Sequence, residues 1–426
     1  MGRRRRKKES FAQARLREEL EAGVPLGTPR CPVSDDCGGC SWQRVPYPRQ
    51  LEWKAQLIEQ SAREQGLEFP DPCVVEPSPR VFGYRNHMEF SFAARRWLTS
   101  EEIASGREFD RDFALGLHAP GGFGRVLDLD GCPLQSSRAD EAFRVVKAFA
   151  LTSGRPAWDA RSHEGFWRYL ILKHGHNTGE LLVHVVTSRP EAALLARLAD
   201  KLFADVEGVV GVTNGVTDRV ADTSEGALVE CIAGRPFLRE TLAGLTVEVG
   251  PRSFFQPNTL TAERIVEIVK DFARSVPSDD VIDLFCGSGL LGLALAEKGR
   301  GVIGVEVIRE ALEAAVRNAR LNGIETVRFI EGDLLRGLPA ELPSPADLVV
   351  CDPPRAGLHP KTLRALVAMK PRSIIHVGCN PKTQARDLAT MVREGGYRPI
   401  RNAAVDQFPH TPHVEQIVLL VSAADS

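Results

Sequence analysis

The carboxyl-terminal part of this chain, from about residue 246 onward, alternates short apolar runs with segments of helical spacing. Strand-like runs rich in Val, Ile and Leu occupy residues 281–285, 302–306, 327–331, 347–352 and 373–378. Helical segments follow the first two runs, one through Lys298 and the other from Ile308 to Asn322. Such alternation predicts a parallel sheet with helices on both faces. Ligands of this architecture bind beyond the carboxyl ends of the strands, so functional residues are expected there.

The preceding part of the chain has a different pattern and predicts a second domain. Alternating apolar runs lie at residues 87–93, 169–173 and 181–187, with one clear helix near 189–203. Gly, Pro and Asn separate these runs, which is typical of a mixed, strand-rich α+β domain. We therefore expect a basic tail and linker over residues 1–30, an α+β domain over 31–245 and an α/β domain over 246–426. The 426-residue length also favours more than one hydrophobic core.

Composition and charge narrow the class of protein. The chain is 43% hydrophobic and 26% charged, which is typical of a soluble globular protein, and no apolar run approaches the roughly 20 residues of a membrane span. Residues 3–8 are all Arg or Lys, but no apolar segment follows them, so we expect a cytoplasmic protein. The formal net charge is −2, so any contact with nucleic acid must come from a local patch or from the tail. The tail is either a solvated arm or a loose phosphate contact.

A glycine-rich loop joins the first predicted strand of the α/β domain to a helix. It reads Asp283-Leu-Phe285-Cys-Gly287-Ser-Gly289, and Gly292 lies in the helix that follows. Glycines permit a tight turn and close approach of a ligand to the backbone. The acidic residue that ends the next strand, Glu306, is placed to accept hydrogen bonds from ribose hydroxyls. A nicotinamide dinucleotide, S-adenosylmethionine and a simple turn without ligand all remain open for this loop alone.

Three downstream motifs favour S-adenosylmethionine. Asp352-Pro353-Pro354 ends the fourth strand, and an acid followed by two prolines at this place is typical of methyltransferases. Cys379 follows the fifth strand, where hydride transfer needs no cysteine but nucleophilic catalysis does. The third motif is the segment 406–415 near the carboxyl terminus, which includes His413 and ends at Glu415.

Taken together, these motifs resemble the RNA 5-methyluridine methyltransferases, which act on uridine in transfer or ribosomal RNA. The matching segments are residues 253–258, 283–289, 304–306, 351–357, 378–387 and 406–415. The resemblance covers roughly residues 31–420. It implies a Rossmann-like class I methyltransferase domain and methyl transfer from S-adenosylmethionine to C5 of a uridine in structured RNA, either 23S ribosomal RNA or transfer RNA. One departure is Leu290, because family members often carry a polar residue after the second glycine.

The resemblance also assigns roles to single residues. Carbon C5 of uracil is a weak nucleophile, and a thiolate that adds at C6 activates it, so the site needs one reactive cysteine and one base. The resemblance gives these roles to Cys379 and Glu415. The residues that match cofactor contacts are Gln256, Phe285, Glu306 and Asp352, with Asp333 as a weaker candidate for the adenine. Alternatives are methylation of cytosine C5 or adenine N6, a nicotinamide-dependent oxidoreductase, and a non-catalytic RNA-binding protein.

Three cysteines lie within ten residues, at Cys31, Cys37 and Cys40. Disulfides are not expected in the cytosol, so metal ligation is the first interpretation of this group. The resemblance supplies Cys132 as a fourth ligand, and four thiolates suit either zinc or a [4Fe–4S] cluster. The resemblance favours an iron–sulfur cluster, with zinc or no metal as the alternatives, and the lack of a redox partner motif predicts a structural role for it. The cysteines interpreted as buried small residues are Cys73, Cys231, Cys286 and Cys351.

The RNA itself is the expected partner, and we expect a monomer with no membrane contact. A uridine inside folded RNA must leave its stack to reach a thiolate. Phe254 and Phe255 are candidates for stacking on it. Candidate RNA contacts in the middle region are Tyr84, Arg85, Asn86, Arg95, Arg96 and Arg161.

Overall fold

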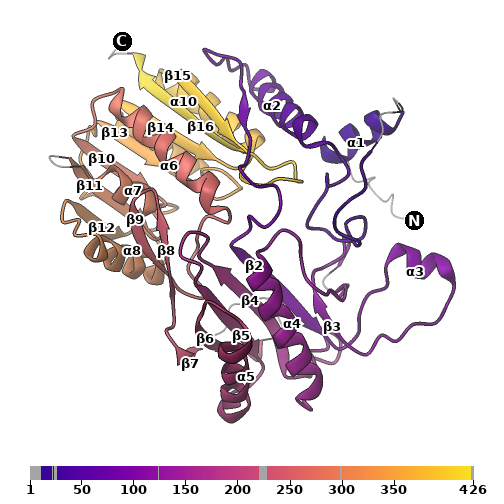
Figure 1. Ribbon diagram of the computed structural model, residues 1–426. Helices are drawn as coiled ribbons and strands as arrows, with labels where there is room; N and C mark the ends of the chain where they lie inside the picture. Colours follow the sequence, from indigo (N-terminus) through magenta and orange to yellow (C-terminus); the bar gives the residue numbers. More distant parts are fainter. Residues whose placement is uncertain are drawn as a thin grey trace.

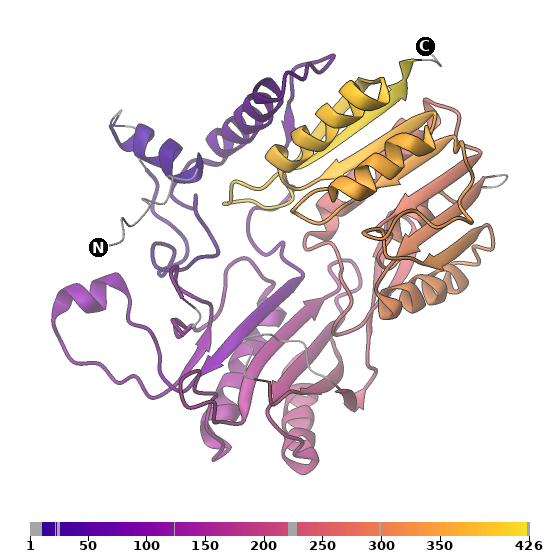
Figure 2. The same ribbon diagram turned by 180° about the vertical axis from the view of Figure 1, so that it is seen from behind.

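The computed structural model describes residues 11–21, 23, 26–122, 124–219, 228–297 and 300–423. These residues form two large sheets with separate cores, one of eight strands and one of six, and a two-stranded sheet (Figures 1 and 2). The basic residues 3–8 lie outside the described part, so the expectations about the tail stay predictions. No helix in the described ranges combines the length and the apolar character that crossing a membrane requires.

The eight-stranded sheet has the order β1-β15-β16-β14-β13-β10-β11-β12. Its strands are β1 (Val75–Glu76), β10 (Asp280–Leu284), β11 (Gly301–Glu306), β12 (Val327–Glu331), β13 (Leu348–Cys351), β14 (Ser373–Gly378), β15 (Tyr397–Val405) and β16 (Glu415–Ser422). All five strands predicted in the α/β region are present, and each pairs in parallel with its neighbours in that group. Only β16 runs antiparallel, between β14 and β15. Central strands such as β13 and β14 are buried on both faces, which explains their continuous Val and Ile runs.

Helices cover both faces of this sheet, as predicted. The core of one face contains residues of α6 (Thr259–Arg274), α7 (Leu290–Leu295), α8 (Arg309–Leu321) and the hairpin β8 (Leu238–Leu242) with β9 (Leu245–Val249). The core of the other face contains residues of α2 (Tyr47–Glu64), α9 (Pro360–Met369) and α10 (Pro381–Gly395), as Figure 2 shows for α9 and α10. The first predicted helix ends earlier than expected, at Leu295, and Lys298 lies outside the described residues.

The six-stranded sheet has the order β3-β2-β4-β5-β6-β7 and is mixed, since only β5 and β6 are parallel. Its strands are β2 (His87–Ala93), β3 (Ala114–Gly116), β4 (Trp167–His174), β5 (Leu181–Thr187), β6 (Val209–Val216) and β7 (Leu228–Gly234). The helices α4 (Ser137–Thr152) and α5 (Ala192–Asp205) pack on one face, and α3 (Ser100–Ser105) lies on a projecting loop (Figure 1). This α+β unit follows the amino-terminal helix α1 (Phe11–Glu21) and α2.

The amino-terminal region crosses over to the eight-stranded sheet. Helix α2 packs on α10, and β1 pairs in parallel with β15. Residues 47–76 therefore touch the sheet that carries the glycine-rich loop, although they precede the six-stranded sheet in the chain. This arrangement brings the amino-terminal segment beside the loop that leads into β16.

Candidate active site

The predicted site residues gather at one edge of the eight-stranded sheet. Because β10 to β14 are parallel, their carboxyl ends share that edge, and the amino end of the antiparallel β16 joins them. Gly378 of β14 pairs with Gln416 of β16. Cys379 directly follows Gly378 and Glu415 directly precedes Gln416, so both residues lie at the same end of this strand pair. The predicted residues found at this edge are Phe285, Glu306, Asp333, Asp352, Cys379 and Glu415.

Helix capping fixes the position of Cys379. The side chain of Asn380 accepts a hydrogen bond from the backbone N–H of Lys382, and Pro381 is the first residue of α10. Both features are strong signals for a helix start. Cys379 is thus held between the end of β14 and the first turn of α10, with its side chain half-buried.

Two carboxyl groups, those of Glu415 and Asp352, act on the pKa of the Cys379 thiol. Burial, followed by the charges of Glu415 and Asp352, raises the pKa of the Cys379 thiol to about 12, while Arg355 acts in the opposite direction. Burial and then Asp352 raise the pKa of Glu415 well above its ordinary value. Burial raises the pKa of Asp352 to about 7, against a hydrogen bond from Gln256 that lowers it. The thiol and both carboxyl groups therefore bind their protons more tightly than the free side chains do.

Gln256 connects three segments at this edge. Its Nε2 donates to Oδ2 of Asp352 at 3.3 Å, and its Oε1 accepts from Nε2 of Gln407 at 2.9 Å. Its backbone carbonyl accepts from Nδ2 of Asn86 at 2.8 Å. Two residues on, Asn258 caps α6. The Gln256 amide is consequently oriented toward Asp352 by partners on both sides.

The glycine-rich loop has the backbone geometry that a ligand cradle needs. Gly287 and Gly289 have φ values of 54° and 87°, and a Cβ at Gly287 would meet nothing within 4 Å. Phe285 has a φ of 63°, a strained conformation for a bulky residue. Glu306 accepts from the N–H of Gly287 at 3.1 Å and of Val307 at 2.8 Å. The loop and the end of β11 are thereby joined around the Glu306 carboxylate.

Sequence reasoning missed an apolar surface beside Glu306 and Asp333. Val307, Ile308 and Leu335 are 54%, 57% and 56% exposed, and the N–H of Leu335 donates to Oδ1 of Asp333 at 3.0 Å. Exposed apolar side chains of this kind can pack against a flat apolar group of a ligand. The available signal was the Val-Ile pair directly after the acid that ends β11.

The loop before β16 is held by the amino-terminal segment. Lys54 of α2 forms an ion pair with Asp406, both side chains are fully buried, and Lys54 also donates to the carbonyl of Phe408 at 3.0 Å. Gln50 accepts from the N–H of His410 at 2.8 Å. These contacts join helix α2 to the strand that begins with Glu415. They could not be read from local sequence patterns, because the partners are about 350 residues apart.

We expect the variant Lys54→Met to lower the free energy of unfolding by about 3–5 kcal/mol, because it leaves the carboxylate of Asp406 buried without its cation. Urea titration measures the change. Lys361→Met, at an exposed lysine of α9, is the control. The double variant with Asp406→Asn should recover part of the loss. If Lys54→Met is as stable as the control, the pair does not anchor this loop.

Several expected contacts are wrong. Tyr84 and Asn86 are only 2% and 3% exposed, so they are not on an RNA-binding surface. Both residues contact the interior instead. The backbone N–H of Asn86 donates to the carbonyl of Pro257, and the Tyr84 hydroxyl donates to the carbonyl of Pro409. Phe255 is 7% exposed and belongs to the core, whereas Phe254 is 66% exposed. Cys231, expected to be buried, is exposed on β7.

The four cysteines predicted as ligands lie near one another. Cys37 and Cys40 pack against the core that contains Cys132. Burial is the main cause that raises the pKa of the Cys132 thiol to about 12, and the charges of the other three thiolates add to it. No three His, Cys, Asp or Glu side chains of the described ranges stand in a metal-ligating arrangement. The set of donors, four thiols gathered from two segments, nevertheless fits a thiolate-bound metal group.

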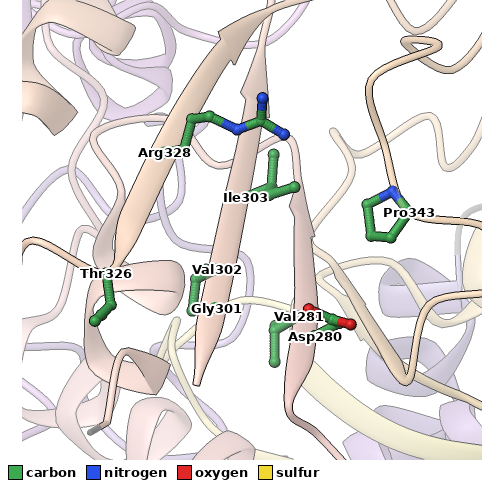
Figure 3. Close-up of a pocket in the computed structure, with 8 residues that line it drawn as sticks. All are labelled: Asp280, Val281, Gly301, Val302, Ile303, Thr326, Arg328 and Pro343. Carbon is green, nitrogen blue, oxygen red and sulfur yellow. The ribbon is translucent and has the colours of Figure 1, made fainter. Parts of the chain in front are cut away.

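The pocket in Figure 3 lies away from these residues. It encloses 220 Å³ and is lined by Asp280, Gly301 and Val302, among others. These residues begin β10 and β11, so the pocket opens at the opposite edge of the sheet from Cys379. Its volume is below the roughly 300 Å³ of ordinary ligand pockets. We assign it no role.

Comparison with known proteins agrees with the architecture. The methyltransferase-domain family matches residues 276–416. A relative from Chlorobaculum tepidum, described as an uncharacterized RNA methyltransferase, is 36% identical over 417 residues, or 96% of this chain and 86% of the relative. A second, from Caldanaerobacter subterraneus, has the same description and is 36% identical over 97% of this chain and 89% of its own length. The chain belongs to the RNA methyltransferases.

A solved structure resembles this RNA methyltransferase over most of its length. It is the tRNA (uracil-54, C5)-methyltransferase of Pyrococcus abyssi, crystallised with S-adenosyl-L-homocysteine. The two chains are 30% identical with a TM-score of 0.71, over 92% of this chain and 86% of the other. The similarity thus includes the six-stranded sheet as well as the methyltransferase domain, which confirms the predicted fold class.

Proposed function

We propose that this RNA methyltransferase transfers a methyl group from S-adenosylmethionine to C5 of a uridine in structured RNA, through a covalent bond between Cys379 and C6 of the uracil. The observation that carries the proposal is the position of a half-buried cysteine beside two carboxyl groups, Asp352 and Glu415, at the ligand-binding edge of the sheet. The similarity to a tRNA (uracil-54, C5)-methyltransferase supports the choice of uracil C5.

Each residue of the site has a separate role in the proposed reaction. The Cys379 thiolate would add to C6, and the electron pair displaced toward C5 would form a bond to the methyl carbon. The bond between that carbon and the sulfonium sulfur of S-adenosylmethionine would break, which leaves neutral S-adenosylhomocysteine. Glu415 then takes the proton from C5, and the bond between sulfur and C6 breaks to restore the aromatic ring. Asp352 and Gln256 orient the reacting groups, and Nε2 of Gln256 donates a hydrogen bond to Oδ2 of Asp352 at 3.3 Å.

The cofactor would occupy the glycine-rich loop. Glu306 is the proposed acceptor for ribose hydroxyls, and its carboxylate is already fixed by three backbone N–H groups. The exposed Val307, Ile308 and Leu335 would cover the adenine, with Asp333 at its edge. Phe285, Gln256 and Asp352 complete the contacts toward the methyl group.

The RNA target is proposed to present a flipped uridine, in ribosomal or transfer RNA. Phe254 is exposed two residues before Gln256, so its ring can stack on a base that has left its helix. Cys351, the other cysteine at a strand end, is fully buried in β13 and cannot reach a base. Enzymes that methylate cytosine C5 use a cysteine at this strand, which is β13 here. The burial of Cys351 therefore disfavours that alternative.

We further propose that Cys31, Cys37, Cys40 and Cys132 hold a [4Fe–4S] cluster. The cluster would cross-link the amino-terminal loop to the core of the six-stranded sheet, in a structural role. The backbone N–H groups of Ser41 and Trp42 donate to the carbonyl of His410 at 2.9 and 3.0 Å, so the segment after Cys40 also contacts the loop before β16.

Cofactor affinity should depend on pH. Asp352, with a pKa of about 7 in the free protein, is ionised above that pH and protonated below it. A sulfonium cation binds the ionised form better, so affinity for S-adenosylmethionine should fall about three- to tenfold as the pH drops from 8 to 6. The neutral thioether S-adenosylhomocysteine should lose less. Calorimetry with both ligands at the two pH values tests this, and equal losses would contradict it.

The direct test of the function is the methylated nucleoside. The protein is incubated with S-adenosylmethionine and RNA from cells that lack it, and the digested RNA is analysed by mass spectrometry. The proposal predicts 5-methyluridine. Methyladenosine or 5-methylcytidine in its place would refute the choice of uracil C5 but leave the methyltransferase assignment intact.

A further inference from the structure

Arg355 connects the segment of the nucleophile to the segment of the base. Its backbone carbonyl accepts hydrogen bonds from Nδ2 of Asn380 at 3.3 Å and from Oγ1 of Thr383 at 3.1 Å. Its Nη2 lies 3.0 Å from Nε2 of His413, which is two residues before Glu415. The backbone of Arg355 is therefore fixed against the residues that directly follow Cys379, and its guanidinium contacts the segment that leads to Glu415, although the residue is exposed.

The charges around this guanidinium are unusual. Arg355 forms no ion pair with any carboxylate of the described residues, and its polar side-chain contact is the His413 ring. Burial, followed by the charge of Arg355, lowers the pKa of His413 to about 4, so the ring is neutral at pH 7 and can accept a hydrogen bond. An arginine keeps its charge at any working pH.

The charged side chains that act on the pKa of the Cys379 thiol are Glu415 from β16 and Asp352 and Arg355 from the loop after β13. Both carboxyl groups oppose its ionisation, and Arg355 is the side chain that favours it. A cysteine adds to uracil only as the thiolate, so a site of this composition needs a cation at the sulfur.

We propose that Arg355, held by Asn380, Thr383 and His413, is a positioning residue whose guanidinium stabilises the thiolate of Cys379. The inference rests on the proposed function only in naming Cys379 as the nucleophile. The thiol proton passes to solvent in the free protein, and no other group changes its charge.

The test measures how fast iodoacetamide alkylates Cys379 in the free, full-length protein, by peptide mass spectrometry between pH 7 and 9.5. Arg355→Met should slow alkylation of Cys379 about three- to tenfold at each pH, because one nearby charge is lost. Arg355→Lys keeps the charge and should retain most of the rate.

Two controls separate this effect from general damage. Arg393→Met removes an exposed charge from the far end of α10 and should leave the Cys379 rate unchanged. The exposed Cys231 serves as an internal standard, whose alkylation should be equal in every variant. Wild-type alkylation in Arg355→Met, or equal slowing by Arg393→Met, would overturn the inference.

The outcome is also distinguishable from failure of the proposed function. Alkylation requires neither RNA nor turnover, so it reports on the arginine and the thiol alone. If Arg355→Met weakens RNA binding but alkylates at the wild-type rate, Arg355 is a phosphate contact and the inference is wrong, while a Cys379 adduct with RNA would still support the proposed function.

Discussion

Replacing Cys379 with alanine is expected to reduce methyl transfer to RNA by about 10⁴-fold or more, because the variant lacks the proposed nucleophile that adds to C6. The change removes one sulfur atom from a half-buried position at the end of β14 and leaves the cap of α10 in place. Cofactor binding and thermal stability should therefore stay close to wild type. Transfer of a radiolabelled methyl group to RNA measures the loss.

The matched control is Cys231→Ala, which removes an exposed thiol from β7. It should retain wild-type activity. Substantial methyl transfer by Cys379→Ala, with the cofactor and RNA both bound, would contradict a nucleophilic role and return adenine N6 to consideration, since that reaction needs no cysteine.

The second large effect is expected for Glu415→Gln. This variant keeps the shape of the side chain but cannot take the proton from C5, so turnover should fall by about 10²–10⁴-fold. The methylated RNA should then remain bonded to Cys379, because elimination requires loss of that proton. Denaturing gel electrophoresis with labelled RNA would detect the adduct.

Glu394→Gln, at an exposed glutamate of α10, provides the control for Glu415→Gln and should show neither effect. The combination of slow turnover and a trapped adduct is specific for a base that acts after methyl transfer. Slow turnover without an adduct would mean that Glu415 acts before methyl transfer. That result would contradict its proposed role as the base that removes the C5 proton.

The sequence was sufficient to predict the edge of the sheet at which the site lies. Parallel strands place their carboxyl ends together, so Glu306, Asp352 and Cys379 could be assigned to one edge from the positions of the strands alone. The proline after Asn380 also marks the start of α10 in the sequence. The roles of these residues came from the resemblance and stay proposals.

The remaining features depend on contacts between distant segments. The ion pair of Lys54 with Asp406 and the contact of Gln50 with His410 cannot be inferred from periodicity, which describes one element at a time. For the same reason Asn86 was interpreted as an RNA contact, although its amide bonds to the carbonyl of Gln256. The left-handed conformation of Phe285 has no signal in the sequence, since β-region values are the default for such a residue.

The covalent intermediate is the central claim of this account, and trapping it is the most direct test. The full-length protein is incubated with S-adenosylmethionine and RNA that carries 5-fluorouridine, whose C5 fluorine cannot leave as a proton does. The account predicts a stable protein–RNA adduct whose peptide mass maps to Cys379 and which Cys379→Ala abolishes. An adduct at another cysteine, or none when both ligands demonstrably bind, would contradict it.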